Sequence, residues 1–267
     1  MDRNRHQLSV LTVSISQKKD IVPGIRNGGR ALCVNSAEAM VAAVREAGLV
    51  PFFENPVPGW SIEEWTPREY WFDGEEDTLG PWDWKIACVQ SGDIAYGKFL
   101  LGGKAAFATF EVYRELMNWR RPRSEYQPSA DQRRVLDLLA EKGSVEMKDV
   151  RRLLGLKKSA ADALMARLQM QTRVVTGDIR RVYRGQDLHY NGWQVSTFCT
   201  PEALFEDSGP APGGFPFEAF LERRTLRTGR TPAESYEFLS DVIRRAAPSL
   251  SSMPAATADR LTSRLLR

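Results

Sequence analysis

The sequence predicts an α+β fold in which a winged helix-turn-helix domain packs with an N-terminal α/β portion, and that portion can itself form a second winged-helix-like unit. Three observations support this prediction. The hydrophobic and charged shares, 42% and 27%, are typical of a folded globular chain. Short apolar runs around a Gly-Gly pair before residue 126 indicate strands. After residue 129, three helical patterns are followed by two β-rich runs.

The chain of 267 residues divides by pattern into four expected parts. Residues 1–35 read as a poorly ordered leader, because they show no sustained periodicity and contain several glycines. Residues 36–125 form the N-terminal α/β, winged-helix-like domain with a Trp-rich acidic loop. Residues 126–207 form the winged helix domain. Residues 208–267 contain a linker and C-terminal helices.

The N-terminal domain should open with a capped helix, continue with a short strand and close with a hairpin and a second helix. Ser, Asn and Thr mark helix starts because their side chains accept a backbone N–H, and Gly marks helix ends and tight turns. The residues that set these boundaries are Asn35 or Ser36, Gly48, Gly102, Gly103, Thr109 and the run Arg120-Arg121-Pro122-Arg123.

Between residues 56 and 84 the chain is rich in Pro, Gly, acidic residues and tryptophan, which excludes long regular elements. Tryptophans can stack on unpaired bases, but acidic neighbours would repel phosphate. We therefore interpret Trp60, Trp71, Trp82 and Trp84 as packing residues of a core or of a contact between domains.

The winged helix prediction depends on residues 129–184. Ser129 and Gln132 make a capping box for a first helix that Gly143 ends. A short second helix ends at Gly155, and a third spans about 158–170. The runs 173–176 and 179–183 read as two strands around Gly177-Asp178. Three helices followed by a hairpin are the plan of a helix-turn-helix with a wing.

Positive charge is concentrated in the same segment. Residues 129–184 hold 13 basic and seven acidic side chains, whereas the whole chain carries a net charge of only +3. Phosphate contacts dominate nucleic-acid affinity, so this excess favours duplex DNA as a partner. The expected DNA-binding residues are Lys157, Lys158, Gln169, Arg173, Arg180 and Arg181, with Gln169 nearest any groove.

A protein partner remains an alternative. A helical wheel places Lys158, Ser159, Asp162, Ala166 and Gln169 on the outward face of the third helix. That face is small and nearly neutral, and it lacks the Arg, Asn and Gln cluster that reads base edges well. Winged helices also serve as protein-docking modules, and the sequence leaves the oligomeric state open.

Other chemistries find little support. Cys33, Cys88 and Cys199 lie far apart without pairing spacing, and with two histidines they do not assemble a zinc site, so we expect no metal and no cofactor. His189 has no nucleophile at a recognisable spacing. No run reaches the roughly 20 apolar residues of a membrane span. We expect a cytoplasmic protein with reduced thiols and no membrane partner.

Several segments between about 36 and 205 resemble the short bacterial relatives of the winged-helix DNA glycosylases that repair alkylated or crosslinked purines, the AlkZ/YcaQ group. The segments are Pro51-Phe52-Phe53, Pro58-Gly59-Trp60-Ser61, Gly80-Pro81-Trp82-Asp83-Trp84-Lys85, Ala95-Tyr96-Gly97-Lys98-Phe99 and Leu168-Gln169-Met170-Gln171. The resemblance implies more than one winged-helix unit and DNA as partner.

The full-length glycosylases of that group hold a water with a Gln-apolar-Gln motif. The resemblance therefore makes Gln169 and Gln171 candidate catalytic residues, although this motif lies where the third helix meets the wing and not in an earlier unit. The two glutamines can instead simply cover a helix end.

Three functions follow from these features. The leading one is a DNA-binding protein in repair or in control of transcription. The second is a monofunctional DNA glycosylase that acts on alkylated or crosslinked bases, and the third is a protein-binding winged-helix adaptor. The sequence leaves enzymatic activity open and favours a non-enzymatic role.

Overall fold

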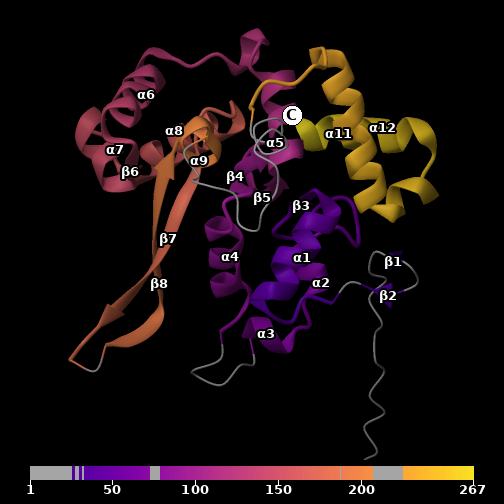
Figure 1. Ribbon diagram of the computed structural model, residues 1–267, viewed down its shortest axis with the longest axis horizontal. Coiled ribbons are helices and arrows are strands. Elements are labelled where there is room, and N and C mark those ends of the chain that lie inside the picture. Colours follow the sequence, from indigo (N-terminus) through magenta and orange to yellow (C-terminus); the bar gives the residue numbers. More distant parts are fainter. Residues whose placement is uncertain (1–25, 28–29, 32, 73–78, 187, 207–224) are drawn as a thin grey trace, which may run out of the picture.

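The computed structural model describes residues 26–27, 30–31, 33–72, 79–186, 188–206 and 225–267 (Figure 1). Most of the expected leader and the expected linker at 208–214 lie outside these residues. Within them the chain mixes helices with small antiparallel sheets, so the predicted α+β class is confirmed. Two residue pairs, β1 (Arg26–Asn27) and β2 (Arg30–Ala31), form a minimal sheet before the main fold.

The first unit, residues 37–109, has the element order helix, strand, helices and two strands. Its strands form an antiparallel sheet in the order β3-β5-β4. The elements are α1 (Ala37–Ala47), β3 (Leu49–Pro51), α2 (Ile62–Trp65), α3 (Glu69–Phe72), α4 (Pro81–Gln90), β4 (Ile94–Leu100) and β5 (Lys104–Thr109).

The second unit, residues 130–199, repeats that order. Its strands also form an antiparallel sheet in which the first strand pairs with the third, in the order β6-β8-β7. The elements are α6 (Ala130–Lys142), β6 (Ser144–Glu146), α7 (Met147–Leu154), α8 (Lys158–Met170), β7 (Val175–Arg184) and β8 (His189–Cys199). Three helices followed by a β-ribbon are therefore present where the sequence places a winged helix.

The remaining helices connect and cover these units. In Figure 1 the yellow C-terminal helices lie beside α5, on the side of the molecule away from the β7–β8 ribbon. The elements are α5 (Phe110–Arg120), the 3₁₀ turn η1 (Ser124–Tyr126), α9 (Pro201–Glu206), α11 (Pro232–Ala246), the 3₁₀ segment η2 (Pro248–Ser252) and α12 (Ala255–Leu266).

Local capping explains where most helices begin and end. The hydroxyl of Ser36 accepts a hydrogen bond from the backbone N–H of Ala39 at 3.1 Å and starts α1. Reciprocal bonds between Ser129 and Gln132 start α6, as predicted, and the same arrangement starts α11. Gly48 ends α1 with φ of 73°, a conformation that glycine adopts without strain.

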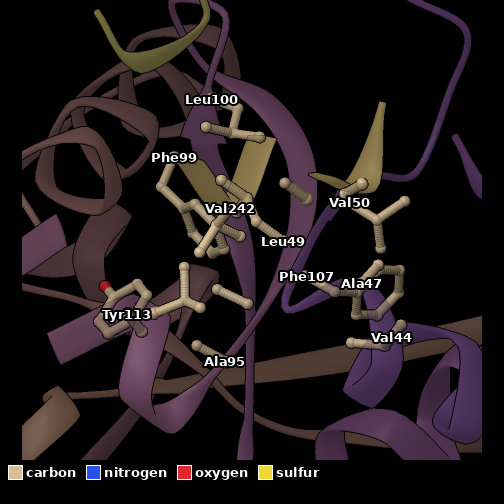
Figure 2. Close-up of a cluster of buried hydrophobic side chains, with 14 of the residues drawn as sticks. Val44, Ala47, Leu49, Val50, Ala95, Phe99, Leu100, Phe107, Tyr113 and Val242 are labelled. Atoms are coloured by element: carbon tan, nitrogen blue, oxygen red, sulfur yellow. The ribbon is translucent and has the colours of Figure 1, made fainter. Parts of the chain in front are cut away.

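The main hydrophobic core joins the first unit to the C-terminal helices. Figure 2 shows Val242 of α11 among Phe99, Leu49 and Tyr113, and all four side chains are almost completely buried. A separate, smaller core lies beneath α6, α7 and α8. The second unit therefore has its own apolar centre, while α11 and α12 complete the first.

The packing interpretation of the tryptophans is correct for most of them. Trp60 and Trp84 are buried, and Trp71 is partly buried against the main core. The indole N–H of Trp60 donates to the carbonyl of Leu49 at 3.0 Å. Trp82 departs from it, because 48% of this residue is exposed.

The irregular segment was predicted to continue to Trp84, and this is wrong because α4 begins at Pro81. Proline is well suited to the first helical position, where its missing N–H leaves no hydrogen bond unmade. Reading Pro81 only as a breaker hid a ten-residue helix, and this helix carries Asp83 and Lys85 into contact with the second unit.

The predicted hairpin turn at Gly177-Asp178 is also wrong. Strand β7 passes through both residues, and its partner β8 begins only at His189. The register shifts between Thr176 and Asp178, so Gly177 is the extra residue of a β-bulge. A side chain there would clash with Cys199, whose Sγ lies 2.8 Å from the position of a Cβ. The ribbon is therefore much longer than predicted.

Candidate nucleic-acid interface and inter-unit cleft

The turn between α7 and α8 presents two free cations. Lys157 is the N-cap residue of α8 and Lys158 is its first residue, and both are exposed. Neither forms an ion pair within the described part of the chain. The start of a helix also offers backbone N–H groups and the positive end of the helix dipole. An anion at this turn would therefore be attracted by the lysines, by the N–H groups and by the dipole.

The two predicted arginines of the ribbon already have acidic partners. Arg180 pairs with Glu146 at 2.9 Å, but 60% of its side chain remains exposed, so it can still meet a phosphate. Arg181 pairs with Asp83 of α4 at 2.9 Å and is only 30% exposed. The acidic Trp-rich segment therefore neutralises one of the two arginines.

Arg173 is less accessible than the sequence indicates. It is half-buried, its Nε has no hydrogen-bond partner, and burial lowers the pKa of its guanidinium, with Arg121 adding repulsion. Of the five predicted phosphate-binding side chains, the structure leaves Lys157, Lys158 and Arg180 open to solvent.

The far end of the ribbon holds exposed residues that the sequence reasoning missed. Tyr183, Leu188 and Trp193 are 51%, 68% and 60% exposed. The guanidinium of Arg184 lies 5.6 Å from the ring centroid of Trp193. This cluster was overlooked because the ribbon was expected to stop at residue 183, although the aromatic residues after His189 in the sequence were a usable indication. In Figure 1 the ribbon runs beside α4, which it contacts through Arg181 and Tyr190.

The C-terminal end of helix α8 is buried, whereas Ala163 and Arg167 remain exposed. Gln169, placed on the outward face by the helical wheel, is only 3% exposed. Its Oε1 accepts a hydrogen bond from the backbone N–H of Lys98 in β4 at 2.7 Å. A Cβ on Gly97 would lie 2.6 Å from that oxygen, so this contact requires glycine. The expected exposure is wrong because strand β4 of the first unit packs against α8.

The two glutamines of the Gln-apolar-Gln motif have different neighbours. Gln171 is 1% exposed, and its Nε2 donates to the carbonyl of Gln127 at 3.0 Å and to Oε1 of Gln132 at 3.1 Å. Its own Oε1 accepts no hydrogen bond. Gln169 contacts β4 and Gln171 contacts the segment before α6 and α6 itself, so the structure does not bring the two amides to one reaction centre.

A cleft of about 210 Å³ lies where the two units meet. It is smaller than the roughly 300–1,000 Å³ of sites for drug-sized ligands, so it fits a single ring or sugar-sized group. Its lining residues with polar side chains are Lys85, Tyr96 and Lys98 from the first unit and Asp162, Gln169, Thr176 and Ser196 from the second.

Lys85 is the unusual group in this cleft. It is 9% exposed, and its ammonium lies 4.8 Å from the ring centroid of Trp82. It has no hydrogen bond or ion pair within the described part of the chain. The carboxylate nearest in sequence, Asp83, is already bound by Arg181 at 2.9 Å and by the hydroxyl of Tyr190 at 2.7 Å. Burial therefore lowers the pKa of Lys85 to about 8.

Comparison with known proteins gives one match. The family model described as "AlkZ related" matches residues 34–252, which is most of the chain. No curated protein and no solved structure matches it. Among the described residues, no helix is long and apolar enough to cross a membrane.

Proposed function

The chain belongs to the AlkZ-related family, and on that premise we propose that it binds duplex DNA, in repair of the duplex or in control of its transcription. One observation carries the proposal. The second unit holds unpaired, exposed lysines at the start of α8 and an exposed cationic and aromatic end of its ribbon.

The α7–α8 turn is the proposed phosphate-binding site. In a helix-turn-helix protein the second helix approaches the duplex with its N-terminal residues, which are Lys157 and Lys158 in this chain. Because β4 covers Gln169 at the C-terminal end of α8, we propose that the helix contributes phosphate contacts and not base-edge contacts. Such contacts are independent of sequence.

The ribbon is the second proposed contact. Arg180 and Arg184 supply positive charge along β7, and Tyr183 and Trp193 supply aromatic surface beside it. An exposed aromatic ring can stack on a base or lie against a sugar, and an arginine next to it can reach the adjoining phosphate. We propose that the winged helix domain, residues 126–207, carries this interface.

The test is duplex binding by the full chain and by Lys157→Ser/Lys158→Ser. We expect the double variant to bind a mixed-sequence duplex about 10- to 100-fold more weakly, since each charge-assisted phosphate contact contributes on the order of 1 kcal/mol. Fluorescence anisotropy with a labelled duplex measures the affinity.

The matched control is Lys104→Ser/Lys142→Ser. It removes the same charge from two exposed lysines, one at the start of β5 and one at the end of α6. We expect its affinity to stay within about twofold of the parent protein, because long-range screening leaves distant charges a small effect. If both double variants lost the same amount of duplex affinity, the loss would follow from the lower net charge of the protein. That result would contradict the proposed site. A protein partner that stays bound after nuclease treatment and a high-salt wash, in a chain that does not bind duplex DNA, would favour the third function. That function is a protein-binding winged-helix adaptor.

Family membership favours a DNA glycosylase as the second candidate function. Hydrolysis of an N-glycosidic bond needs a group that holds a water, and the unpartnered Oε1 of Gln171 is an acceptor of the right kind. Abasic sites formed in alkylated duplex DNA by the parent protein, and absent with Gln171→Ala, would support it. Activity that survives Gln169→Ala and Gln171→Ala would exclude both glutamines as catalytic residues.

A further inference from the structure

The cleft between α4, β4 and α8 holds an amine that packing alone does not explain. Lys85 lines a cavity that both units share, and no described carboxylate pairs with it. The carboxylate of Asp162 also lines the cleft without a hydrogen bond or an ion pair among the described residues. A buried amine and a free carboxylate that share one small cleft and do not pair with each other leave both groups available to a ligand.

The lining of the cleft indicates what this ligand is. A carboxylate inside the cleft repels an anion, so Lys85 is poorly placed to hold a phosphate within it. A desolvated lysine is instead a nucleophile, because a larger fraction of its amine is uncharged near neutral pH. Burial lowers the pKa of Lys85 to about 8, so a larger share of its amine is uncharged near neutral pH than in a solvated lysine. The partner of such an amine is a carbonyl carbon.

We propose that Lys85 forms an imine with an aldehyde, and that the aldehyde is the ring-opened deoxyribose of an abasic site in DNA. This inference rests on the proposed DNA binding. The cleft of about 210 Å³ has the size of a sugar and lies between β4 and α8, the helix that begins with Lys157 and Lys158. Asp162 lies one helical turn after Lys158 and lines the cleft, so a duplex held at those lysines would lie near it.

The reaction balances without a further oxidant or reductant. The lone pair of Nζ attacks the aldehyde carbon, and the carbonyl oxygen takes a proton to give a carbinolamine. The hydroxyl then takes a second proton and leaves as water, while Nζ gives up its two protons and the C=N bond forms. Asp162 is the carboxylate in the cleft that can carry a proton between these atoms.

The test traps the imine in the full chain. A duplex with one natural abasic site is incubated with the protein and cyanoborohydride, which reduces the imine to a stable secondary amine, and the adduct is mapped by mass spectrometry. We expect adduct at Lys85, and at least a tenfold smaller yield in both Lys85→Arg and Lys85→Met. Lys104→Met, which removes an exposed lysine outside the cleft, should give the parental yield.

The pH profile separates a reactive amine from a structural one. The yield should rise from pH 7 and level off above about pH 9, because an amine with a pKa of about 8 is then mostly uncharged, whereas the yield from a solvated lysine would keep rising. The other titratable groups that line the cleft or act on this amine are Asp83 on its own helix, Tyr96 and Lys98 on β4, and Asp162 on α8. An adduct at Lys98, or an unchanged yield in both Lys85 variants, would overturn the proposal.

Two further arms separate this proposal from the proposed function. A duplex with a tetrahydrofuran in place of the sugar binds without offering an aldehyde, and 2-deoxyribose 5-phosphate offers the aldehyde without a duplex. If the protein binds the tetrahydrofuran duplex but forms no adduct with the abasic duplex, the imine proposal is contradicted and the proposed DNA binding is not. Absence of duplex binding contradicts the proposed function. Adduct at Lys85 with the free sugar phosphate but not with abasic DNA overturns the assignment of DNA as the aldehyde.

Discussion

Replacement of Arg120 by methionine is expected to lower the free energy of unfolding by about 3–5 kcal/mol. The Arg120 side chain is completely buried and has no carboxylate partner among the residues that the structure describes. It donates to the carbonyl of Met170 at 3.0 Å and to the carbonyl of Leu266. Methionine fills much of the volume but leaves both carbonyl groups without a donor in a dry environment, which costs several kcal/mol.

The C-terminal ends of three helices explain why the buried Arg120 guanidinium is stable without a carboxylate beside it. Arg120 is the last residue of α5, Met170 the last of α8 and Leu266 the last of α12. The negative ends of three helix dipoles therefore meet at one guanidinium and replace the missing carboxylate. Burial lowers the pKa of Arg120 to about 10, which still keeps it charged at neutral pH.

Urea unfolding followed by circular dichroism measures the change. Arg123→Met is the matched control, because Arg123 is partly exposed and pairs with an exposed carboxylate, Glu125. We expect the control to change the stability by at most about 1 kcal/mol. Equal stability of Arg120→Met and the parent protein would show that the convergence of helix ends contributes nothing.

Glu115→Ala should destabilise the protein by about 2–4 kcal/mol, mainly by loosening α11. The carboxylate of Glu115 is completely buried, and it binds Arg230 at 2.9 Å and the hydroxyl of Ser235 at 2.6 Å. Its loss leaves the buried Ser235 hydroxyl and the Arg230 guanidinium without this acceptor. The half-exposed position of Arg230 keeps the expected cost below that of a fully buried pair.

Two variants make this measurement specific. Glu115→Gln preserves shape and one hydrogen-bond acceptor, so it should lose about half as much stability as Glu115→Ala. Glu237→Ala on the exposed face of α11 should change the stability by less than about 0.5 kcal/mol. A loss in Glu237→Ala as large as that in Glu115→Ala would contradict the role assigned to the buried carboxylate.

Elements with local chemical markers were predictable from the sequence. The capping box at Ser129 and the glycine at position 48 act within a few residues, and they set the helix boundaries found in the structure. The hairpin around Gly102-Gly103 was predictable for the same reason. Such features depend on nearest neighbours, so tertiary contacts do not overrule them.

The errors arise where distant contacts decide the structure. Gly177-Asp178 has the composition of a turn, but the side chain of Cys199 on the partner strand requires a glycine in a bulge at this point. Gln169 lies on the polar face of its own helix, yet the backbone of β4 covers it. Neither neighbour is visible from the local pattern, because each is separated from its contact by many residues.

The same limit explains why the sequence reasoning overlooked Lys85. A lysine in a helix is ordinarily solvated, and the packing of β4 and β7 against α4 buries this one. The ion pair between Asp83 of the first unit and Arg181 of the second also depends on tertiary packing, so the local sequence does not reveal it. The exposure of Lys157 and Lys158 could be predicted from the local sequence, because a cation at the start of a helix is ordinarily solvated.

The dependence of duplex affinity on salt tests the central claim most directly. Lys157, Lys158, Arg180 and Arg184 predict about four phosphate contacts, so the logarithm of the binding constant should fall against the logarithm of salt concentration with a slope of about −3 to −4. In Lys157→Ser/Lys158→Ser the slope should become shallower by about 2. A slope near zero, or one that the double variant leaves unchanged, would contradict DNA binding through this surface.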